Sequence, residues 1–171
     1  AEVRLGDGRV VVAHVPNSGT MRGCSAPGSP CLVAHTPGPR RRLEWTLEQV
    51  MAEGVAVGVN TARANRLAEE ALATGIVRLP GRAPAGTVRR EVTSSPGTRL
   101  DLLLEGGRRR TWVEVKSVTW AESGVALFPD AITARGRKHL LELGRLAAAG
   151  DRAVVLFVVQ RGDAGAVRAA D

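Results

Sequence analysis

Two acidic residues in one predicted hairpin have the spacing of a divalent-metal site. Gly106-Gly107 separates two strand-like runs, and a turn at Gly107-Arg108 without a bulge would pair Asp101 with Glu114. Opposed side chains in such a hairpin have Cβ atoms roughly 4.5–5.5 Å apart. Two carboxylates at that spacing repel each other unless a cation lies between them. The pairing therefore favours a metal site with Asp101 and Glu114 as ligands.

Lys116 is expected on the same face, because strand side chains alternate with a period of two. It is one of only two lysines among 24 basic residues, and a lysine is a compact charge that can lie between carboxylates. Oxygen ligands select Mg²⁺ or Mn²⁺ over zinc. Lys116 would hold or activate a metal-bound water, or stabilise negative charge on a phosphate. The opposite face of the hairpin is expected to be apolar, with Leu100, Leu102, Leu104, Val113 and Val115.

A site of this kind usually has another carboxylate, and three acids are candidates. Glu91 lies on the strand before the hairpin, and Glu69 and Glu70 lie on the first predicted helix. Glu91 could instead form an ion pair with a neighbouring arginine, and Glu70 could pair with Arg66 one helical turn earlier. For the hairpin itself, the alternative is an exposed sheet face with an ordinary acid–lysine pair, or a register that slips by one residue. The sequence leaves these choices open.

Composition favours a polyanionic partner. The 171 residues carry a net charge of +7, and residues 60–171 hold 18 basic and 12 acidic side chains. The longest apolar run, Ala153–Val159, is too short to span a bilayer, so we expect a cytoplasmic protein without a membrane partner. Cys24 and Cys31 match no zinc-binding spacing and are expected to be small core residues in a reducing cytosol.

Residues 1–59 have the pattern of short strands separated by glycine-rich turns, which is typical of a small barrel or sandwich. Pro16–Pro30 is expected to be a loop. The five runs with strand character are Glu2–Leu5, Arg9–Val15, Cys31–His35, Leu43–Met51 and Val55–Val59.

The pattern changes after Val59 to that of an α/β or α+β domain, so we expect domains at residues 1–59 and 60–171. Thr61 should cap a helix over Ala62–Thr74 that Gly75 ends, and Thr133 a helix to Ala149 that Gly150 ends. A loop is expected at Pro80–Gly86. The predicted strands are Thr87–Thr93, Arg99–Glu105, Arg110–Thr119 and Ala153–Val159, the last buried on both faces.

Asp101, twelve residues, then Glu114-Val115-Lys116 resembles the core motif of the PD-(D/E)xK nuclease superfamily, which has the restriction-endonuclease-like fold. Over nearly its whole length the chain also resembles the sugar fermentation stimulation protein A family. The segments that carry this second resemblance are Ala13–Gly19 with Met21, Gly58–Thr61, Asn65–Leu67, Arg90–Val92, Arg99–Asp101, Val113–Thr119, Ala126–Ala131, Thr133, Arg135-Gly136, Lys138–Leu140 and Ala153–Gln160.

The resemblance implies an N-terminal OB-like β-barrel followed by a PD-(D/E)xK domain with a mixed central sheet flanked by helices. It implies DNA binding, with a role in regulating maltose metabolism. By match to the motif, Asp101 and Glu114 become metal ligands and Lys116 the catalytic lysine, while Glu91 and Glu70 fall at acidic positions. Thr20 departs from the pattern, which usually has Arg there. Relative to the family pattern, we expect both ends of the chain to be trimmed.

Several basic residues are candidates for contact with nucleic-acid phosphates. Cations at a helix N-terminus oppose the helix dipole, and a bound phosphate would reverse that cost. Asp130 is either a fourth acid near the metal or a capping or turn residue, and the sequence favours the second role. The loop run of three arginines could track a nucleic-acid backbone, and the resemblance adds one asparagine from the loop before Thr20. The candidates are Arg135, Arg137, Lys138 and His139 at the last helix, Arg40, Arg41 and Arg42 in a loop, and Asn17.

The residues and the basic charge suggest two functions, and the name of the resembled family alone suggests a third. The first is a DNA-binding protein with a divalent-metal site and little sequence specificity, with RNA as the alternative substrate. The second is an active Mg²⁺-dependent nuclease that cleaves DNA or RNA. A carbohydrate-binding or metabolic protein ranks last, because aromatic residues make up only 3% of the chain and no sugar-stacking platform is evident.

Overall fold

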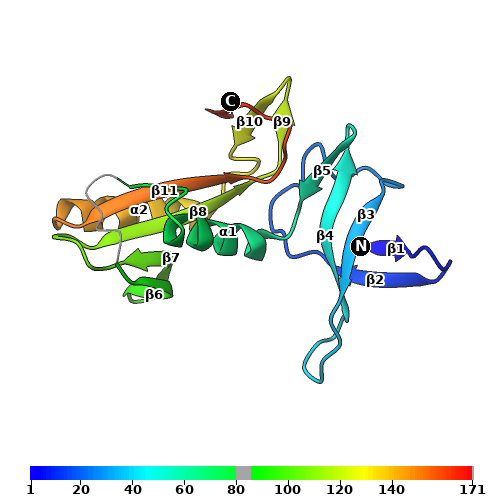
Figure 1. Cartoon of the computed structure of the whole chain (residues 1–171), viewed down its shortest axis with the longest axis horizontal. Coiled ribbons are helices and arrows are strands. Elements are labelled where there is room, and N and C mark those ends of the chain that lie inside the picture. The colour runs from blue at the N-terminus through cyan, green and yellow to red at the C-terminus, as the bar shows by residue number, and fades with distance from the viewer. Residues whose placement is uncertain (80–85, 171) are drawn as a thin grey trace. The chain divides into compact units, whose positions relative to one another are not determined.

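A computed structural model describes residues 1–79 and 86–170 (Figure 1). The chain forms two compact units. The first contains Ala1–Ala62, Val118–Ala131 and the chain from Val159 onward, and the second contains Arg63–Ser117 and Ile132–Val158. The domain boundary predicted after residue 59 stays a prediction. Two later segments, Val118–Ala131 and the chain from Val159, also pack into the first unit. Of the predicted loop at 80–86, all but Gly86 lies outside the described residues.

Five strands of the first unit form one sheet, close to the ranges predicted from the sequence. Their order is β1-β2-β4-β3, and β5 pairs with β4; the β2–β4 pairing is parallel and the others are antiparallel. Cys24 lies in the core of this unit as expected, but Cys31 is exposed at the start of β3, so its assignment to the core was wrong. The strands are β1 (Glu2–Arg4), β2 (Val10–His14), β3 (Cys31–His35), β4 (Trp45–Ala52) and β5 (Val55–Gly58).

A second, three-stranded sheet in the first unit was not predicted. It is formed by β9 (Ala121–Glu122), β10 (Val125–Phe128) and β12 (Ala166–Ala169), in the order β12-β10-β9. The strands are two to four residues long, and every residue of β12 is exposed. Because β12 has no buried face and the other two strands are short, there is no alternation of apolar and polar residues long enough for a sequence pattern to detect.

The second unit is a mixed sheet flanked by helices, as predicted. Its order is β11-β8-β7-β6, with antiparallel pairing of β6 to β7 and of β7 to β8. Arg152 N–H donates to Arg110 O and Gln160 N–H donates to Val118 O, so β11 runs parallel to β8. The elements are α1 (Thr61–Ala73), β6 (Val88–Ser95), β7 (Thr98–Leu104), β8 (Thr111–Val118), α2 (Ala134–Ala148) and β11 (Arg152–Val159).

Each face of this sheet is covered by one helix (Figure 1). Ala64, Ala68 and Leu72 of α1 pack on one face, and Leu143 and Leu146 of α2 pack on the other. Strand β11 contacts both clusters but lies at the sheet edge, so most of its residues are only half-buried and Phe157 is exposed. Both faces of β11 thus pack into the core, as expected, but the side chains are only half-buried, because one edge of the strand has no neighbouring strand in the described sheet.

The helix boundaries confirm one predicted cap and correct the other. Thr133 caps α2, with its hydroxyl accepting the Gly136 N–H at 3.0 Å. At α1 the capping oxygen belongs to Asn60, whose Oδ1 accepts the Ala62 N–H at 3.1 Å. The Thr61 hydroxyl instead donates to Pro16 O at 2.7 Å, so it ties the helix start to a loop. No helix in the described ranges is long and apolar enough to cross a membrane.

Candidate metal centre

The β7–β8 hairpin has the predicted register. Leu103 pairs with Trp112, and the pairing extends from Leu104 with Thr111 to Leu102 with Val113. Continued by one residue, this register brings Asp101 and Glu114 to opposite positions on the two strands. The part of the prediction that depends on register is thus confirmed up to the last paired residues.

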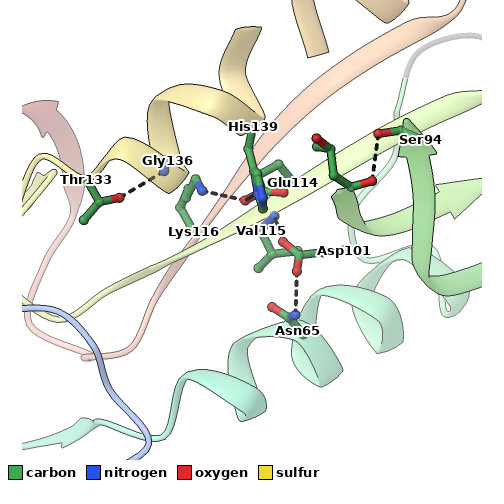
Figure 2. A network of polar contacts seen from close by, with 10 residues as sticks. Asn65, Ser94, Asp101, Glu114, Val115, Lys116, Thr133, Gly136 and His139 are labelled. Carbon is green, nitrogen blue, oxygen red and sulfur yellow. Dashed lines mark hydrogen bonds and ion pairs between the residues drawn. The ribbon is translucent and has the colours of Figure 1, made fainter. Parts of the chain in front are cut away.

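The prediction that Asp101 shares one face with Glu114 and Lys116 was wrong. Leu100 packs with the buried leucines of α2, whereas Leu102 packs with the buried residues of α1 on the other face. The regular alternation of β7 therefore breaks at Asp101. The Asp101 carboxylate turns toward α1, where Oδ1 accepts from Asn65 Nδ2 at 2.9 Å (Figure 2). The break occurs where the β7–β8 pairing ends. Strand β7 stays paired with β6 on both sides of it, at Leu102 with Arg90 and at Leu100 with Val92, and Glu91 between these partners has a φ of 54°.

Asp101 is held in an environment that disfavours its charge. Burial is the largest cause and raises the pKa of Asp101 above 3.8, and the nearby negative charge of Glu114 raises it further. Hydrogen bonds from the Val115 N–H, at 2.8 Å, and from Asn65 act in the opposite direction. Asp101 contacts α1 and Glu114 contacts α2, on opposite faces of the sheet. The charge of Glu114 nevertheless contributes to the pKa shift of Asp101, so the two carboxylates interact.

Glu114 is buried, with 3% of its surface exposed, and its two oxygens differ sharply. Oε1 accepts from Lys116 Nζ at 2.6 Å and lies 2.6 Å from His139 Nδ1 (Figure 2). Oε2 is also buried but has no hydrogen-bond partner among the described residues. A buried acceptor without a partner costs stability, so a group that would satisfy it is expected at this position.

The basic residues at the start of α2 separate into two sets. Arg135 and Arg137 are exposed, and Lys138 reaches across to donate from Nζ to Gly97 O at 2.8 Å. His139 is only 6% exposed and faces Glu114, so its assignment to the nucleic-acid surface was wrong. Its position, four residues before Leu143, places it on the buried stripe of the helix.

The three acids considered as a further ligand lie outside the hydrogen-bond network of Glu114. Glu91 has a φ of 54° and pairs with Arg99 at 2.8 Å, with more than half of its side chain exposed. Glu69 pairs with Arg90 at 3.1 Å, and Glu70 is exposed on α1. For Glu91 the structure shows the arginine pair that the sequence had left as its alternative.

The remaining candidates belong to the first unit. Arg40, Arg41 and Arg42 are exposed in the loop between β3 and β4, and Arg41 also donates to Thr46 Oγ1 at 2.7 Å. Asn17 Oδ1 accepts the Gly19 N–H at 2.8 Å. These residues therefore lie in a different compact unit from Asp101 and Glu114.

Asp130 structures the loop that contains Thr20. Its Oδ2 accepts the Thr20 N–H at 2.9 Å, and a Cβ on Gly19 would collide with the same carboxylate. This contact fits the expected role of a turn residue rather than that of another metal ligand. Asp130 also belongs to the first compact unit, whereas the acids of the hairpin belong to the second.

The donor set near Glu114 fits a small, hard cation. Within residues 1–79 and 86–170, no group of three or more His, Cys, Asp or Glu side chains is arranged to hold a metal ion. Mg²⁺ is commonly held by one or two carboxylates, with water and phosphate oxygens as the other ligands. Asp101 and the free Oε2 of Glu114 supply that minimum set, whereas a structural zinc site needs four protein ligands.

Comparison with known families decides the identity of the chain. A family model described as the sugar fermentation stimulation protein RE domain matches residues 62–171, and the SfsA N-terminal OB domain matches residues 1–59. The chain belongs to the sugar fermentation stimulation protein family. The family resemblance inferred from the motifs is thereby confirmed, and so is the fold class, a mixed α/β chain with an OB domain at its N-terminus.

Individual members of the sugar fermentation stimulation protein family are close in sequence. A homologue from Geobacter sulfurreducens is 52% identical over the whole of this chain, which covers 72% of that protein. One from Thioalkalivibrio sulfidiphilus is 50% identical, again over the whole chain and 72% of the relative. The solved structure of Pyrococcus furiosus SfsA in complex with Ca²⁺ has a TM-score of 0.84 at 24% identity, over 95% of this chain and 68% of that one.

Sequence reasoning missed Asn65 and gave His139 a different role, although both residues contact the carboxylates of the site. Asn65 contacts Asp101, and His139 contacts Glu114. A signal existed for His139, since it lies in register with Leu143 and Leu146 on the apolar stripe of α2. For Asn65 the signal was weaker, because the residue only borders the stripe of Ala64 and Ala68.

Proposed function

We propose that this family member binds nucleic acid through its phosphates and holds a divalent cation, Mg²⁺ or Mn²⁺, at Asp101 and Glu114. The observation that carries the proposal is the buried Glu114 Oε2, which has no partner in the described parts of the chain. Beside it lies a second carboxylate whose pKa the Glu114 charge raises. A cation would satisfy the free oxygen and remove the repulsion between the two acids at once.

The charge balance supports a phosphate-rich partner. The chain carries a net charge of +7, and exposed arginines occur both in the β3–β4 loop and at the start of α2. Contacts of this kind bind the nucleic-acid backbone and read little sequence. We therefore propose DNA as the partner, at low sequence specificity. The names of the relatives, which refer to stimulation of sugar fermentation, suit a regulatory role for such binding.

A bound cation would orient a phosphate and neutralise negative charge on it. Support for a cation also comes from the Pyrococcus relative, which was solved with Ca²⁺. Among the residues of this chain, Asp101 and Glu114 would hold the ion. Asn65 and the Val115 N–H would fix the direction of the Asp101 carboxylate.

A second candidate function is phosphodiester cleavage, and Lys116 is the observation that favours it. Its ammonium lies 2.6 Å from Glu114 Oε1 and only 15% of the side chain is exposed. The Lys116 ammonium held there can orient a water molecule or stabilise the negative charge that develops on a phosphate. Asp101, Glu114 and Lys116 are the residue set of the nuclease motif, so cleavage is tested together with binding.

One set of assays separates these functions. Wild type and Asp101→Asn are mixed with labelled single- and double-stranded DNA and RNA, in chelator and in Mn²⁺. Binding that persists in chelator, with metal-dependent tightening lost in Asp101→Asn, supports the binding function. Cleavage by wild type that Asp101→Asn and Lys116→Met both abolish supports the nuclease. Absence of both binding and cleavage for every substrate rejects both functions.

A further inference from the structure

His139 does not serve the surface on which the sequence had placed it. It is buried on α2, and its Nδ1 lies 2.6 Å from Glu114 Oε1. An ionised carboxylate can only accept hydrogen bonds, so with Glu114 ionised Nδ1 is the donor. The imidazole is thus aimed at one particular oxygen of the acid.

Together with Lys116, this contact uses the full capacity of that oxygen. A carboxylate oxygen has two lone pairs, and Oε1 accepts one hydrogen bond from Lys116 Nζ and one from His139 Nδ1. Oε2 accepts none from the described residues. The carboxylate is therefore divided into a saturated oxygen and an open one, and Figure 2 shows both donors converging on Glu114.

We infer that His139 is a positioning residue that leaves Glu114 only its Oε2 to offer a cation, and that it thereby sets which cation binds. This inference rests on the proposed metal site. A carboxylate restricted to one oxygen suits Mg²⁺ and Mn²⁺, which demand near-ideal octahedral geometry. Ca²⁺ also takes carboxylates through both oxygens in more flexible geometry, and a saturated Oε1 denies it that mode.

The test measures the affinities of the whole chain for Mn²⁺ and for Ca²⁺ by calorimetry, in wild type, in three His139 variants and in one control variant. His139→Leu removes the donor while keeping a buried side chain. His139→Asn keeps an amide donor near the position of Nδ1, whereas His139→Gln carries its amide nearer to the position of Nε2. The expected loss for a partner of a metal ligand is about 10–100-fold.

In His139→Leu and His139→Gln we expect Mn²⁺ affinity to fall about tenfold or more and Ca²⁺ affinity to fall less, so that the Mn²⁺/Ca²⁺ preference drops. His139→Asn should keep both affinities within about threefold of wild type. Should His139→Leu fail to fold, the comparison of His139→Asn with His139→Gln decides the matter. A matched control is Leu146→Ala, which weakens α2 packing without touching Glu114 and should leave the preference unchanged.

The outcomes distinguish this inference from the proposed function. If wild type binds Mn²⁺ and the His139 variants keep its affinity and preference, the positioning role is overturned while the metal site stands. Equal losses for both ions in all three variants also overturn it, because they show a structural role alone. If wild type binds neither ion, the metal site fails and the inference fails with it.

Discussion

The Asp101 carboxylate accepts the backbone N–H of Val115 at 2.8 Å, just beyond the last paired residues of the β7–β8 ladder. A side chain here takes the place of a main-chain acceptor. The contact holds a half-buried carboxylate near Glu114, at the point where the β7–β8 pairing ends. The geometry of the candidate site therefore depends on where the ladder stops as much as on which residues are present.

Replacing Asp101 by Asn should relieve electrostatic strain when no metal is bound. Burial first, and the Glu114 charge second, raise the pKa of Asp101 above 3.8. The folded chain then binds this proton more tightly than the unfolded chain, so stability falls as pH rises from 3.8 through the raised value. In chelator at neutral pH, Asp101→Asn should melt at or above the wild-type temperature, and the difference should shrink in acid. A lower melting temperature at neutral pH would contradict this account.

Added Mn²⁺ should reverse that order. A ligand at 100 times its Kd stabilises the folded state by about 2.7 kcal/mol, which raises the melting temperature of a chain of this size by about 5–10 °C. Wild type should show this rise and Asp101→Asn should not. Thermal melts with Mn²⁺ in a concentration series measure the effect, and equal shifts in the two proteins would place the ion elsewhere.

Glu91→Gln should leave the metal affinity within about twofold of wild type. The side chain is more than half exposed and is engaged by Arg99 at 2.8 Å, so its removal costs at most about 1 kcal/mol of stability. Glu114→Gln is the positive control, expected to weaken Mn²⁺ binding at least about tenfold. A tenfold loss in Glu91→Gln would instead return Glu91 to the site as a ligand.

The arginine loop should contribute to the salt dependence of DNA binding. Replacing both Arg40 and Arg42 by Ala should lower the slope of log affinity against log salt by up to about 1.8, since each neutralised phosphate contributes about 0.9. Arg9→Ala, which removes an exposed arginine already paired with Asp7 at 2.7 Å, is the matched control. If the slope of log affinity against log salt is unchanged in the double variant, the phosphate contacts belong to other arginines, such as those at the start of α2.

Glu142 should make the second unit sensitive to strong acid. The hydrogen bond from Arg145 holds the pKa of Glu142 at about 2, below its ordinary 4.5. Because the native pKa is depressed, its stabilising contribution is present above pH 4.5 and is lost as pH falls toward 2. Glu142→Gln should therefore melt below wild type at neutral pH and converge with it in acid. Melting curves at several pH values check this, and a constant difference would contradict it.

Sequence patterns located most of the fold because long, half-buried elements leave periodic signals. The hairpin register, the mixed sheet and the Thr133 cap all followed from such signals. The patterns failed where regularity ends. The direction of Asp101 depends on a break in strand alternation, and the cap of α1 depends on whether Asn60 or Thr61 faces the helix start.

For the candidate site, residue types identified the acids and the lysine. They did not identify the contacts that orient each carboxylate. His139 was classed by its charge, although its helical position beside Leu143 indicated burial. Glu91 was classed by its place before the hairpin, although a side chain facing solvent is free to meet an arginine. The contact of His139 with Glu114 joins elements far apart in the chain, and the contact of Glu91 with Arg99 joins the neighbouring strands β6 and β7. Single-sequence periodicity reports neither contact.

The composition of the first unit has a consequence for synthesis on the ribosome. Domains generally fold in the order in which they emerge. Here the first unit also contains Val118–Ala131 and the chain from Val159, where Gly58 N–H donates to Gln160 O and the buried Arg161 contacts Glu53 and Asp163. The core of the five strands made first lies wholly before Asn60, but their edge at Gly58 stays without this partner until the sheet of the second unit has been translated. A nascent chain halted before Val159 should expose this unfinished edge to chaperones and proteases.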